Sequence, residues 1–130
     1  MIIPIKQLVF HCGPACIAMV MTVCGHPIDQ VVIGKQLQVV ARKGCSSNDI
    51  ARYLSSQGLQ AEVSRDVSNI QPLEIVKTGK HFMVVAGRDG DDYVLVEPLG
   101  GMFTKRGEQW FQQSVSEVVR IQKGQEKCVL

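Results

Sequence analysis

Cys12 stands directly before Gly13 and Pro14, and a long apolar run follows these residues. Proline has a fixed φ and lacks an N–H, so it fits the first turn of a helix and places Cys12 at the helix N-terminus. The unpaired N–H groups and the helix dipole at that end favour a thiolate over a thiol. Gln7 lies five positions earlier and can direct a side-chain amide to the same place. Together these residues are typical of a cysteine nucleophile with a donor for a developing oxyanion.

A histidine and a glutamate can complete a catalytic triad with this cysteine. His81 opens a predicted strand and Glu97 closes the next one, and the hairpin signal Asp89-Gly-Asp-Asp92 lies between them. In an antiparallel pair, the start of one strand lies beside the end of the next. If the helix that begins at Cys12 packs across this end of the sheet, His81 can act as the base and Glu97 can orient its imidazole.

The elements that must position these residues are helical in the first half of the chain. A helix is predicted over residues 13–24, with Gly25 as its stop, and it is apolar on all faces, so other elements must enclose it. A second helix is expected over about 29–37. A third, which opens with a capping signal, is expected between Ser46 and Gly58.

The second half of the chain alternates between apolar and polar residues, as strands do. Strands are expected at 60–64, 81–87, 93–97, 102–104 and 117–121. Residues 67–76 are predicted to form a turn or short helix around Pro72, and another short helix is expected at 110–111. Helices first and an antiparallel sheet second make an α+β fold, with residues 1–122 as a single domain and 123–130 as a C-terminal tail.

The composition is that of a globular protein, since 45% of the 130 residues are hydrophobic and 20% are charged. A net charge of +2 is too small to indicate nucleic acid. The longest apolar run, 15–23, is about half of the roughly 20 residues that a membrane span requires. Residues 1–6 lack the basic region and cleavage site of a signal peptide. We therefore expect a cytoplasmic protein without membrane insertion.

The five cysteines are odd in number and irregular in spacing, which makes a poor disulfide framework, so we expect reduced thiols. Several Cys and His residues are close in sequence and raise the question of a metal site: His11, Cys12, Cys16, Cys24 and His26. No paired C-x2-C motif accompanies them, and small thiols packed in a helix explain the cysteines better than zinc does. We expect neither a metal nor a cofactor.

Five stretches occur in a characteristic order: Gln7, His11-Cys-Gly-Pro-Ala-Cys16, Gly44-Cys-Ser-Ser-Asn-Asp-Ile50 with Gly58, Lys80-His-Phe82 and Glu97-Pro-Leu-Gly100. Over about residues 5–121 this ordered set resembles the bacteriocin-processing, double-glycine-leader peptidases. That family is a branch of the papain-like cysteine peptidases, and its members are often N-terminal domains of ABC exporters. The resemblance implies a papain-like fold in which Cys12 is the nucleophile, His81 the base and Gln7 the oxyanion donor.

The chain departs from the family pattern at three points. His11 stands where the family usually has an acid before the nucleophile, and Glu97 stands before Pro98 where the family usually has aspartate. Gln7 is one residue closer to the cysteine than is usual. Because glutamate is one methylene longer than aspartate, the carboxylate is expected to orient the imidazole with a different geometry.

These observations predict a cysteine hydrolase, above all a peptidase that cleaves a peptide bond through an acyl-enzyme at Cys12. Its partners would be a peptide or protein substrate and an exporter domain. An inactive relative that binds peptides is an alternative, and in it Cys12 would be unreactive.

A further alternative is a toxin domain of a bacterial competition system, delivered into a target-cell cytoplasm and met there by an immunity protein. Papain-like folds also occur in such domains, where the same Cys and His deamidate proteins or attack RNA. Nucleic acid is expected only in this case, facing four basic residues: Arg42, Lys43, Lys105 and Arg106. A solvated surface explains these residues better than an RNA-binding patch does.

Overall fold

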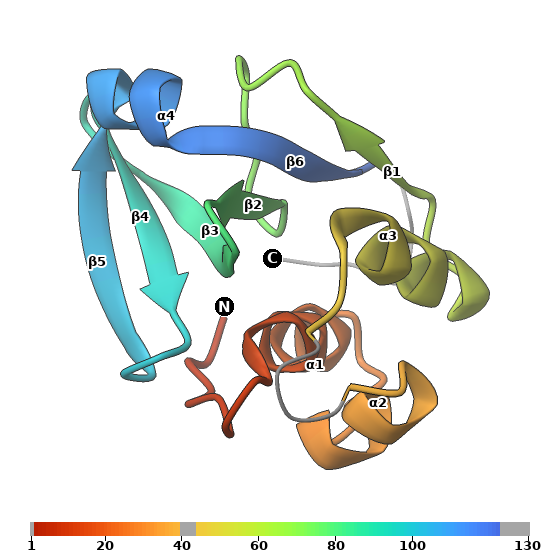
Figure 1. Cartoon of the computed structure of the whole chain (residues 1–130). Coiled ribbons are helices and arrows are strands. Elements are labelled where there is room, and N and C mark those ends of the chain that lie inside the picture. The colour runs from red at the N-terminus through yellow and green to blue at the C-terminus, as the bar shows by residue number, and fades with distance from the viewer. Residues whose placement is uncertain (1, 40–43, 123–130) are drawn as a thin grey trace.

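The structure, a computed structural model, describes residues 2–39 and 44–122. The elements are α1 (Cys12–Val23), α2 (Gln30–Gln36), α3 (Ser47–Ser56), β1 (Ala61–Ser64), β2 (Ile75–Thr78), β3 (His81–Asp89), β4 (Asp92–Glu97), β5 (Met102–Gly107), α4 (Glu108–Ser114) and β6 (Val115–Ile121). Three helices thus precede the sheet, so the predicted α+β class is confirmed (Figure 1). The tail predicted for 123–130 lies outside the described residues.

The six strands form one antiparallel sheet in the order β1-β6-β2-β3-β4-β5. Strand β6 is the last along the chain, yet it lies between β1 and β2. Figure 1 shows α1, α2 and α3 on one side of this sheet and α4 beyond its other side. The pairing of β3 with β4 brings the start of the first strand beside the end of the second, as the hairpin signal predicts.

Alternate residues of the central strands serve two separate clusters of buried side chains. In β3, Phe82 and Val84 pack with the three N-terminal helices, whereas Met83 and Val85 pack with Phe111 of α4. This two-residue period follows from the pleat, which directs successive side chains to opposite faces. The sheet is therefore covered by apolar side chains on both faces.

Helix α1 lies in the larger cluster and is buried from Gly13 to Met21. Its backbone begins at Cys12, and Gly25, with φ of 81°, follows the C-cap at Cys24 in the left-handed conformation expected of a helix stop. The prediction that this apolar helix is enclosed by other elements is confirmed. A helix packed on all faces holds its first residue in a fixed place.

The capping signals of the next two helices are confirmed by their hydrogen bonds. The Asp29 carboxylate accepts the Val31 N–H at 2.8 Å and caps α2. At α3, the Ser46 hydroxyl accepts the Asp49 N–H at 3.1 Å, and the Asp49 carboxylate accepts the Ser46 N–H at 3.0 Å. This reciprocal pair is a capping box, which fixes where α3 begins.

The prediction of a turn or short helix around Pro72 was wrong over residues 75–76, which belong to β2. This strand pairs with both β3 and β6 near the middle of the sheet. Ile75 and Val76 are both buried, one in each apolar cluster. A strand of four residues that is covered on both faces lacks the polar alternation by which strands are recognised in a sequence.

The expectation of reduced cysteines holds for Cys12, Cys16 and Cys45, which are free thiols, and is wrong for Cys24, which is disulfide-bonded. Spacing along a chain does not reveal which backbone positions meet in space, and that approach decides whether a disulfide forms. Within the described ranges, no group of three or more His, Cys, Asp and Glu side chains is placed to hold a metal ion. None of the helices described here is long and apolar enough to cross a membrane.

Helix α2 meets the segment before Cys12 at a glycine. A Cβ added to Gly34 would lie 2.5 Å from His11 Nε2, which is closer than real Cβ contacts. The His11 ring has little freedom to move away, because its Nδ1 lies 2.7 Å from the Val9 carbonyl oxygen and donates to it. Gly34 therefore allows the helix backbone to approach this ring.

We predict that Gly34→Ala lowers the free energy of unfolding by about 1 kcal/mol, although alanine at an open helix position normally raises it by about that amount. The sign is reversed because the new Cβ would meet the His11 ring. Urea denaturation followed by circular dichroism measures the change. In a His11→Ala background the obstacle is gone, so Gly34→Ala should stabilise. A gain from Gly34→Ala alone would contradict this packing.

Candidate active site

A tight turn leads into the helix that carries Cys12. The His11 N–H donates to the Leu8 carbonyl oxygen at 2.9 Å, and Phe10 has a positive φ of 61°. A hydrogen bond between the first and fourth residues of a turn brings its two ends together. Gln7 and Cys12 therefore flank the turn, one entering it and the other leaving it.

The Cys12 thiol is half-buried and lies among hydrogen-bond donors. Burial by itself raises the pKa of this thiol. Hydrogen bonds from the His81 ring and from the Phe82 and Gly13 N–H groups, together with the charge of His81, outweigh burial and lower the pKa of Cys12 below its ordinary value of 9.0. The site favours the thiolate, the nucleophilic form of cysteine.

His81 lies between the thiol and a carboxylate. Its Nε2 is 2.5 Å from Glu97 Oε1, and its ring is hydrogen-bonded to Cys12 on the other side. The hydrogen bond with Cys12 is the main cause that raises the pKa of His81; burial opposes it, and Glu97 adds to it. Since Nε2 faces Glu97, Nδ1 is the nitrogen left for the thiol. The structure thus brings Cys12, His81 and Glu97 together, in the order that the sequence predicts.

The carboxylate of Glu97 has a second donor besides the imidazole. The Leu99 N–H donates to Glu97 Oε1 at 2.9 Å, across the turn that follows β4. This backbone bond holds the longer glutamate side chain in a folded position above its own turn. The methylene that distinguishes it from aspartate is accommodated in this way.

Gln7 is placed beside the same turn by its backbone. Its N–H donates to the Pro98 carbonyl oxygen at 2.7 Å, one residue after Glu97. Its side-chain Nε2 makes a 3.4 Å hydrogen bond to the carbonyl oxygen of Leu8, and its Oε1 is buried without a hydrogen-bond partner among the described residues. The Gln7 amide is therefore held only weakly by its own contacts.

The other two free thiols near the site are held in the thiol form. Burial raises the pKa of Cys16 well above its ordinary value and raises the pKa of Cys45 to about 12. Cys45 also packs on the backbone at the start of α1, since a Cβ added to Gly13 would lie 2.1 Å from its Sγ. Of these three thiols, Cys12 is the one whose pKa is lowered.

Two residues of α2 that contact the segment before Cys12 were not identified from the sequence. These are Gly34, which adjoins His11, and Gln30, which hydrogen-bonds to the main chain at Lys6 and Leu8. The only sequence signal was a glycine inside a helical pattern, which often marks a close approach. A surface glutamine carries no comparable signal.

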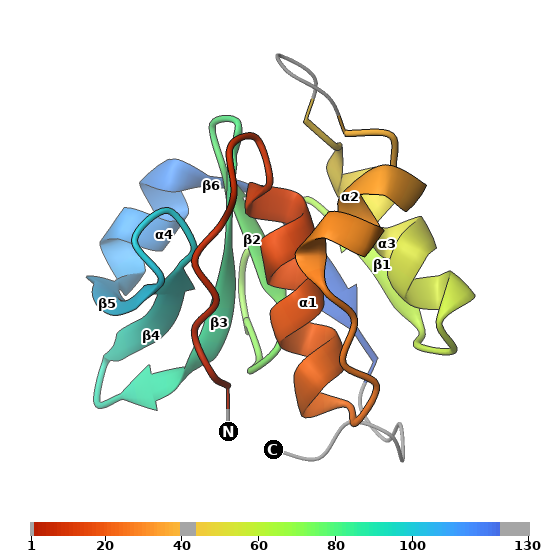
Figure 2. The ribbon, with the colours of Figure 1, turned by 90° about the horizontal axis from the view of Figure 1, so that it is seen from below.

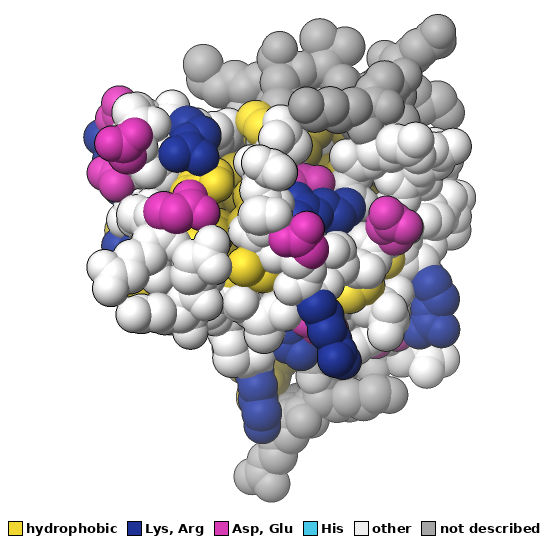
Figure 3. Space-filling view, turned by 90° about the horizontal axis from the view of Figure 1, so that it is seen from above, with side chains coloured by type: hydrophobic (Ala, Val, Ile, Leu, Met, Phe, Trp, Pro, Cys, Tyr) yellow, Lys and Arg dark blue, Asp and Glu magenta, His cyan; other side chains and the backbone are white. Residues whose placement is uncertain are grey.

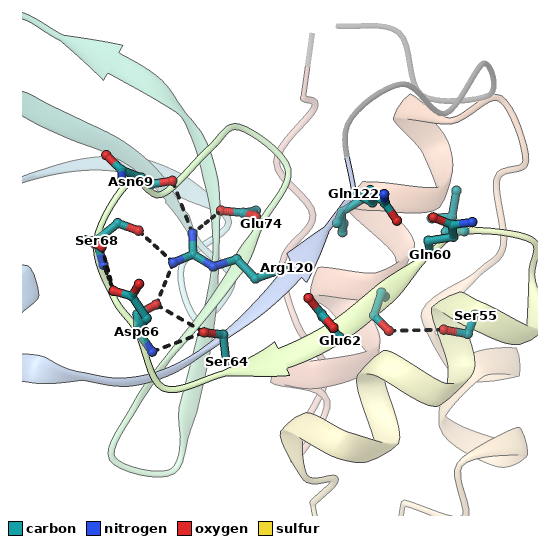
Figure 4. Close-up of a pocket in the computed structure, with 13 residues that line it drawn as sticks. Ser55, Gln60, Glu62, Ser64, Asp66, Ser68, Asn69, Glu74, Arg120 and Gln122 are labelled. Atoms are coloured by element: carbon teal, nitrogen blue, oxygen red, sulfur yellow. Dashed lines mark hydrogen bonds and ion pairs between the residues drawn. The ribbon is translucent and has the colours of Figure 1, made fainter.

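A cavity of about 850 Å³ lies on another part of the molecule, and none of Cys12, His81, Glu97 and Gln7 lines it. At its wall, the Arg120 guanidinium donates to Glu74 Oε1 at 2.9 Å and to backbone carbonyl oxygens of the loop before β2 (Figure 4). Glu74 is buried, so Arg120 and Glu74 form a structural pair that anchors this loop. Figure 3 looks onto this side of the molecule, where acidic and basic side chains are interspersed.

The basic residues of the RNA-facing hypothesis do not form a free patch where they are described. Lys105 pairs with Asp89, and the Arg106 guanidinium lies 5.5 Å from the centre of the Trp110 ring. Both are on β5, at an edge of the sheet. Arg42 and Lys43 lie outside the described residues.

Comparison with known proteins identifies the family. The model of the Peptidase C39 family matches residues 7–125, nearly the whole chain. No curated protein matches it.

Solved structures share the fold at low sequence identity. The peptidase domain of Streptococcus ComA, a bi-functional ABC transporter involved in quorum sensing, is 17% identical with a TM-score of 0.78, over 93% of this chain and 98% of that one. A double glycine motif protease from an AMS/PCAT transporter, solved with the leader peptide, is 19% identical with a TM-score of 0.80, over 93% of this chain and 91% of that one. The peptidase domain of Streptococcus mutans ComA with a small-molecule inhibitor is 14% identical with a TM-score of 0.62, over 92% and 98%.

The family match spans far more than half of the chain, and the solved structures have the same papain-like arrangement of helices packed on an antiparallel sheet. The family match explains why the motifs of this chain resemble those of the double-glycine-leader peptidases. The chain belongs to the Peptidase C39 family and is a cysteine peptidase.

Proposed function

We propose that this peptidase cleaves its substrate with Cys12 as nucleophile, His81 as general base and acid, and Glu97 as the group that orients His81. The observation that carries this proposal is the place of the His81 imidazole between the Cys12 thiol, whose pKa it lowers, and the Glu97 carboxylate, 2.5 Å from its Nε2. The pKa of Cys12 is lowered and the pKa of His81 is raised, and both directions favour a thiolate beside an imidazolium.

In the first step, the Cys12 thiolate attacks the carbonyl carbon of the scissile peptide bond. The oxyanion of the tetrahedral intermediate accepts hydrogen bonds from the Cys12 N–H and the Gln7 side-chain amide. The imidazolium of His81 gives its proton to the leaving nitrogen, the C–N bond breaks, and a thioester to Cys12 remains. His81 then takes a proton from water, which attacks the thioester and releases the carboxylic acid.

Glu97 contributes by fixing which nitrogen of His81 faces the thiol. Its carboxylate lies at Nε2 and stabilises the imidazolium, so Nδ1 exchanges the proton with Cys12 and the leaving group. The Leu99 N–H keeps this carboxylate in place before substrate binds. This division of roles matches a triad in which the acid positions the base and does not itself transfer protons.

We infer that the substrate is a leader peptide with a double-glycine junction, presented by an exporter that carries or binds this domain. Family membership supports this inference, as do the solved structures, of which one is a transporter's peptidase domain and another a double glycine motif protease in complex with the leader peptide. Four exposed apolar side chains adjoin the site: Leu8, Val9, Phe10 and Leu99. Such a surface suits an apolar peptide better than a charged nucleic acid.

We expect the purified chain to cleave a synthetic leader peptide after its Gly-Gly pair, and Cys12→Ala to reduce the rate at least about 10³-fold, because the nucleophile is lost. A peptide aldehyde should label wild-type protein at Cys12, as read by mass spectrometry. Cys45→Ala is the matched control, and labelling should survive it. Labelling that persists in Cys12→Ala would contradict the assignment, as would cleavage of tRNA without cleavage of peptide.

The alkylation rate of Cys12 by iodoacetamide should fall with decreasing pH at an inflection below 9.0, since the pKa of this thiol is lowered. Reactivity is retained above the lowered pKa and lost as the pH falls through it. His81→Ala removes the hydrogen bond and the charge that oppose burial, so the inflection should move upward. An inflection that is the same in both proteins would show that His81 does not stabilise the thiolate.

Glu97→Gln should lower kcat by about 10- to 100-fold and lower the pKa of His81, because a neutral amide stabilises the imidazolium less than a carboxylate does. NMR titration of the His81 ring protons measures the pKa, and peptide cleavage measures kcat. Glu74→Gln is the matched control, since Glu74 pairs with Arg120 on another part of the molecule. Equal loss of kcat in both variants would point to general destabilisation.

A further inference from the structure

One side chain of α2 pairs with the main chain on both sides of Gln7. Gln30 Nε2 donates to the Lys6 carbonyl oxygen at 2.8 Å, and Gln30 Oε1 accepts the Leu8 N–H at 3.0 Å. In an extended segment these two groups point to the same side of the chain and flank the residue between them. The Gln30 amide therefore pairs with this segment much as a neighbouring strand would.

The opposite edge of the segment is fixed by the turn after β4. The Gln7 N–H donates to the Pro98 carbonyl oxygen at 2.7 Å, and a Cβ added to Gly101 would lie 2.9 Å from the Lys6 Cβ. Figure 2 shows the N-terminal segment between the loop that joins β4 to β5 and the helix α1 into which it turns. Three hydrogen bonds from two sides thus determine where the backbone of Gln7 lies.

The side chain of Gln7 depends on this backbone support because its own contacts are weak. Its Nε2 reaches only the neighbouring Leu8 carbonyl oxygen, at 3.4 Å, and no described residue donates to its buried Oε1. An oxyanion donor must already be in place when charge develops, since reorganisation during the reaction adds to the barrier. The position of the Gln7 amide therefore depends on the main chain at residues 6–8.

We propose that Gln30 is a positioning residue for the oxyanion hole: its side-chain amide holds the main chain on both sides of Gln7 and thereby sets the place of the Gln7 amide. The inference rests on the proposed function, in which Gln7 is the oxyanion donor. The inference assigns the support of the thiolate and the support of the oxyanion to different groups. Thiolate formation depends on groups around Cys12 such as His81, whereas oxyanion stabilisation depends in addition on α2.

A second contact of the same helix supports this role. Gly34 is one turn after Gln30, so both residues lie on one face of α2. At Gly34 the helix backbone adjoins the His11 ring, next to Cys12. Helix α2 therefore lies along the segment from Lys6 to His11, and it meets this segment at two points one helical turn apart.

The test compares Gln30→Ala with Gln7→Ala in steady-state cleavage of a Gly-Gly leader peptide. Loss of an oxyanion donor should lower kcat by about 10²-fold in Gln7→Ala. Misplacement of the donor should lower kcat by about tenfold in Gln30→Ala, with KM nearly unchanged. Alkylation of Cys12 by iodoacetamide, which develops no oxyanion, should change by less than about twofold in both variants. The double variant should be no slower than Gln7→Ala, because Gln30 acts through Gln7.

Gln36→Ala is the matched control, because it removes a glutamine from the same helix whose Oε1 bonds to the Tyr53 hydroxyl at 2.5 Å and not to residues 6–8. Its kcat should equal that of the wild type. If Gln30→Ala fails to fold, Gln30→Glu serves instead: it keeps an acceptor for the Leu8 N–H, loses the donor to Lys6, and should lower kcat in the same direction.

The outcomes separate this inference from the proposed function. An unchanged kcat in Gln7→Ala would remove Gln7 from the proposed oxyanion hole, and the inference with it. A loss in Gln7→Ala without a loss in Gln30→Ala would leave the proposed function standing and overturn the inference. The inference would also be overturned if the kcat losses of the two single variants multiplied in the double variant. An equal fall in the alkylation rate and in kcat for Gln30→Ala would overturn it as well.

Discussion

The site depends on the balance between the contributions that raise and those that lower the pKa of the Cys12 thiol. Burial of Cys12 disfavours its charged form, and three kinds of contact reverse that effect: the His81 ring, the Phe82 N–H and the Gly13 N–H. Two of these contacts come from the start of β3 and the third comes from the N-terminus of α1. Because contributions of opposite sign compete, the pKa of the thiol depends on the position of β3 relative to α1. The packing of the helix on the sheet is therefore part of the chemistry.

The rest of the fold limits such displacements. Helix α1 is apolar on all sides, so it is enclosed, and its first residue moves only if the larger apolar cluster moves. Strand β3 is paired on both edges and covered on both faces. At the other end of the site, Glu97 is bonded to the backbone of its own turn. Cys12 and His81 thus come from a helix and a strand, while Gln7 comes from an irregular segment that hydrogen-bonds to neighbouring elements.

The sequence predicted features that depend on local rules. The place of Cys12 at a helix N-terminus follows from Gly13-Pro14, and the start of α3 follows from the capping box at Ser46. The meeting of His81 with Glu97 was also predictable, because a short hairpin brings the start of one strand to the end of the next. Strand β2, the disulfide at Cys24 and the contacts of Gln30 were not predicted. These features arise from approaches between distant segments, for which neither periodicity nor capping chemistry provides a signal.

The position of β6 has a consequence for how the protein is made. A ribosome delivers Cys12 early and His81 and Glu97 much later, while β6, the strand that joins β1 to β2, is the last strand among the described residues. Until β6 emerges, β2 lacks one neighbour, and the sheet that carries the imidazole is divided. During synthesis Cys12 is therefore present long before the sheet that places His81 beside it is complete.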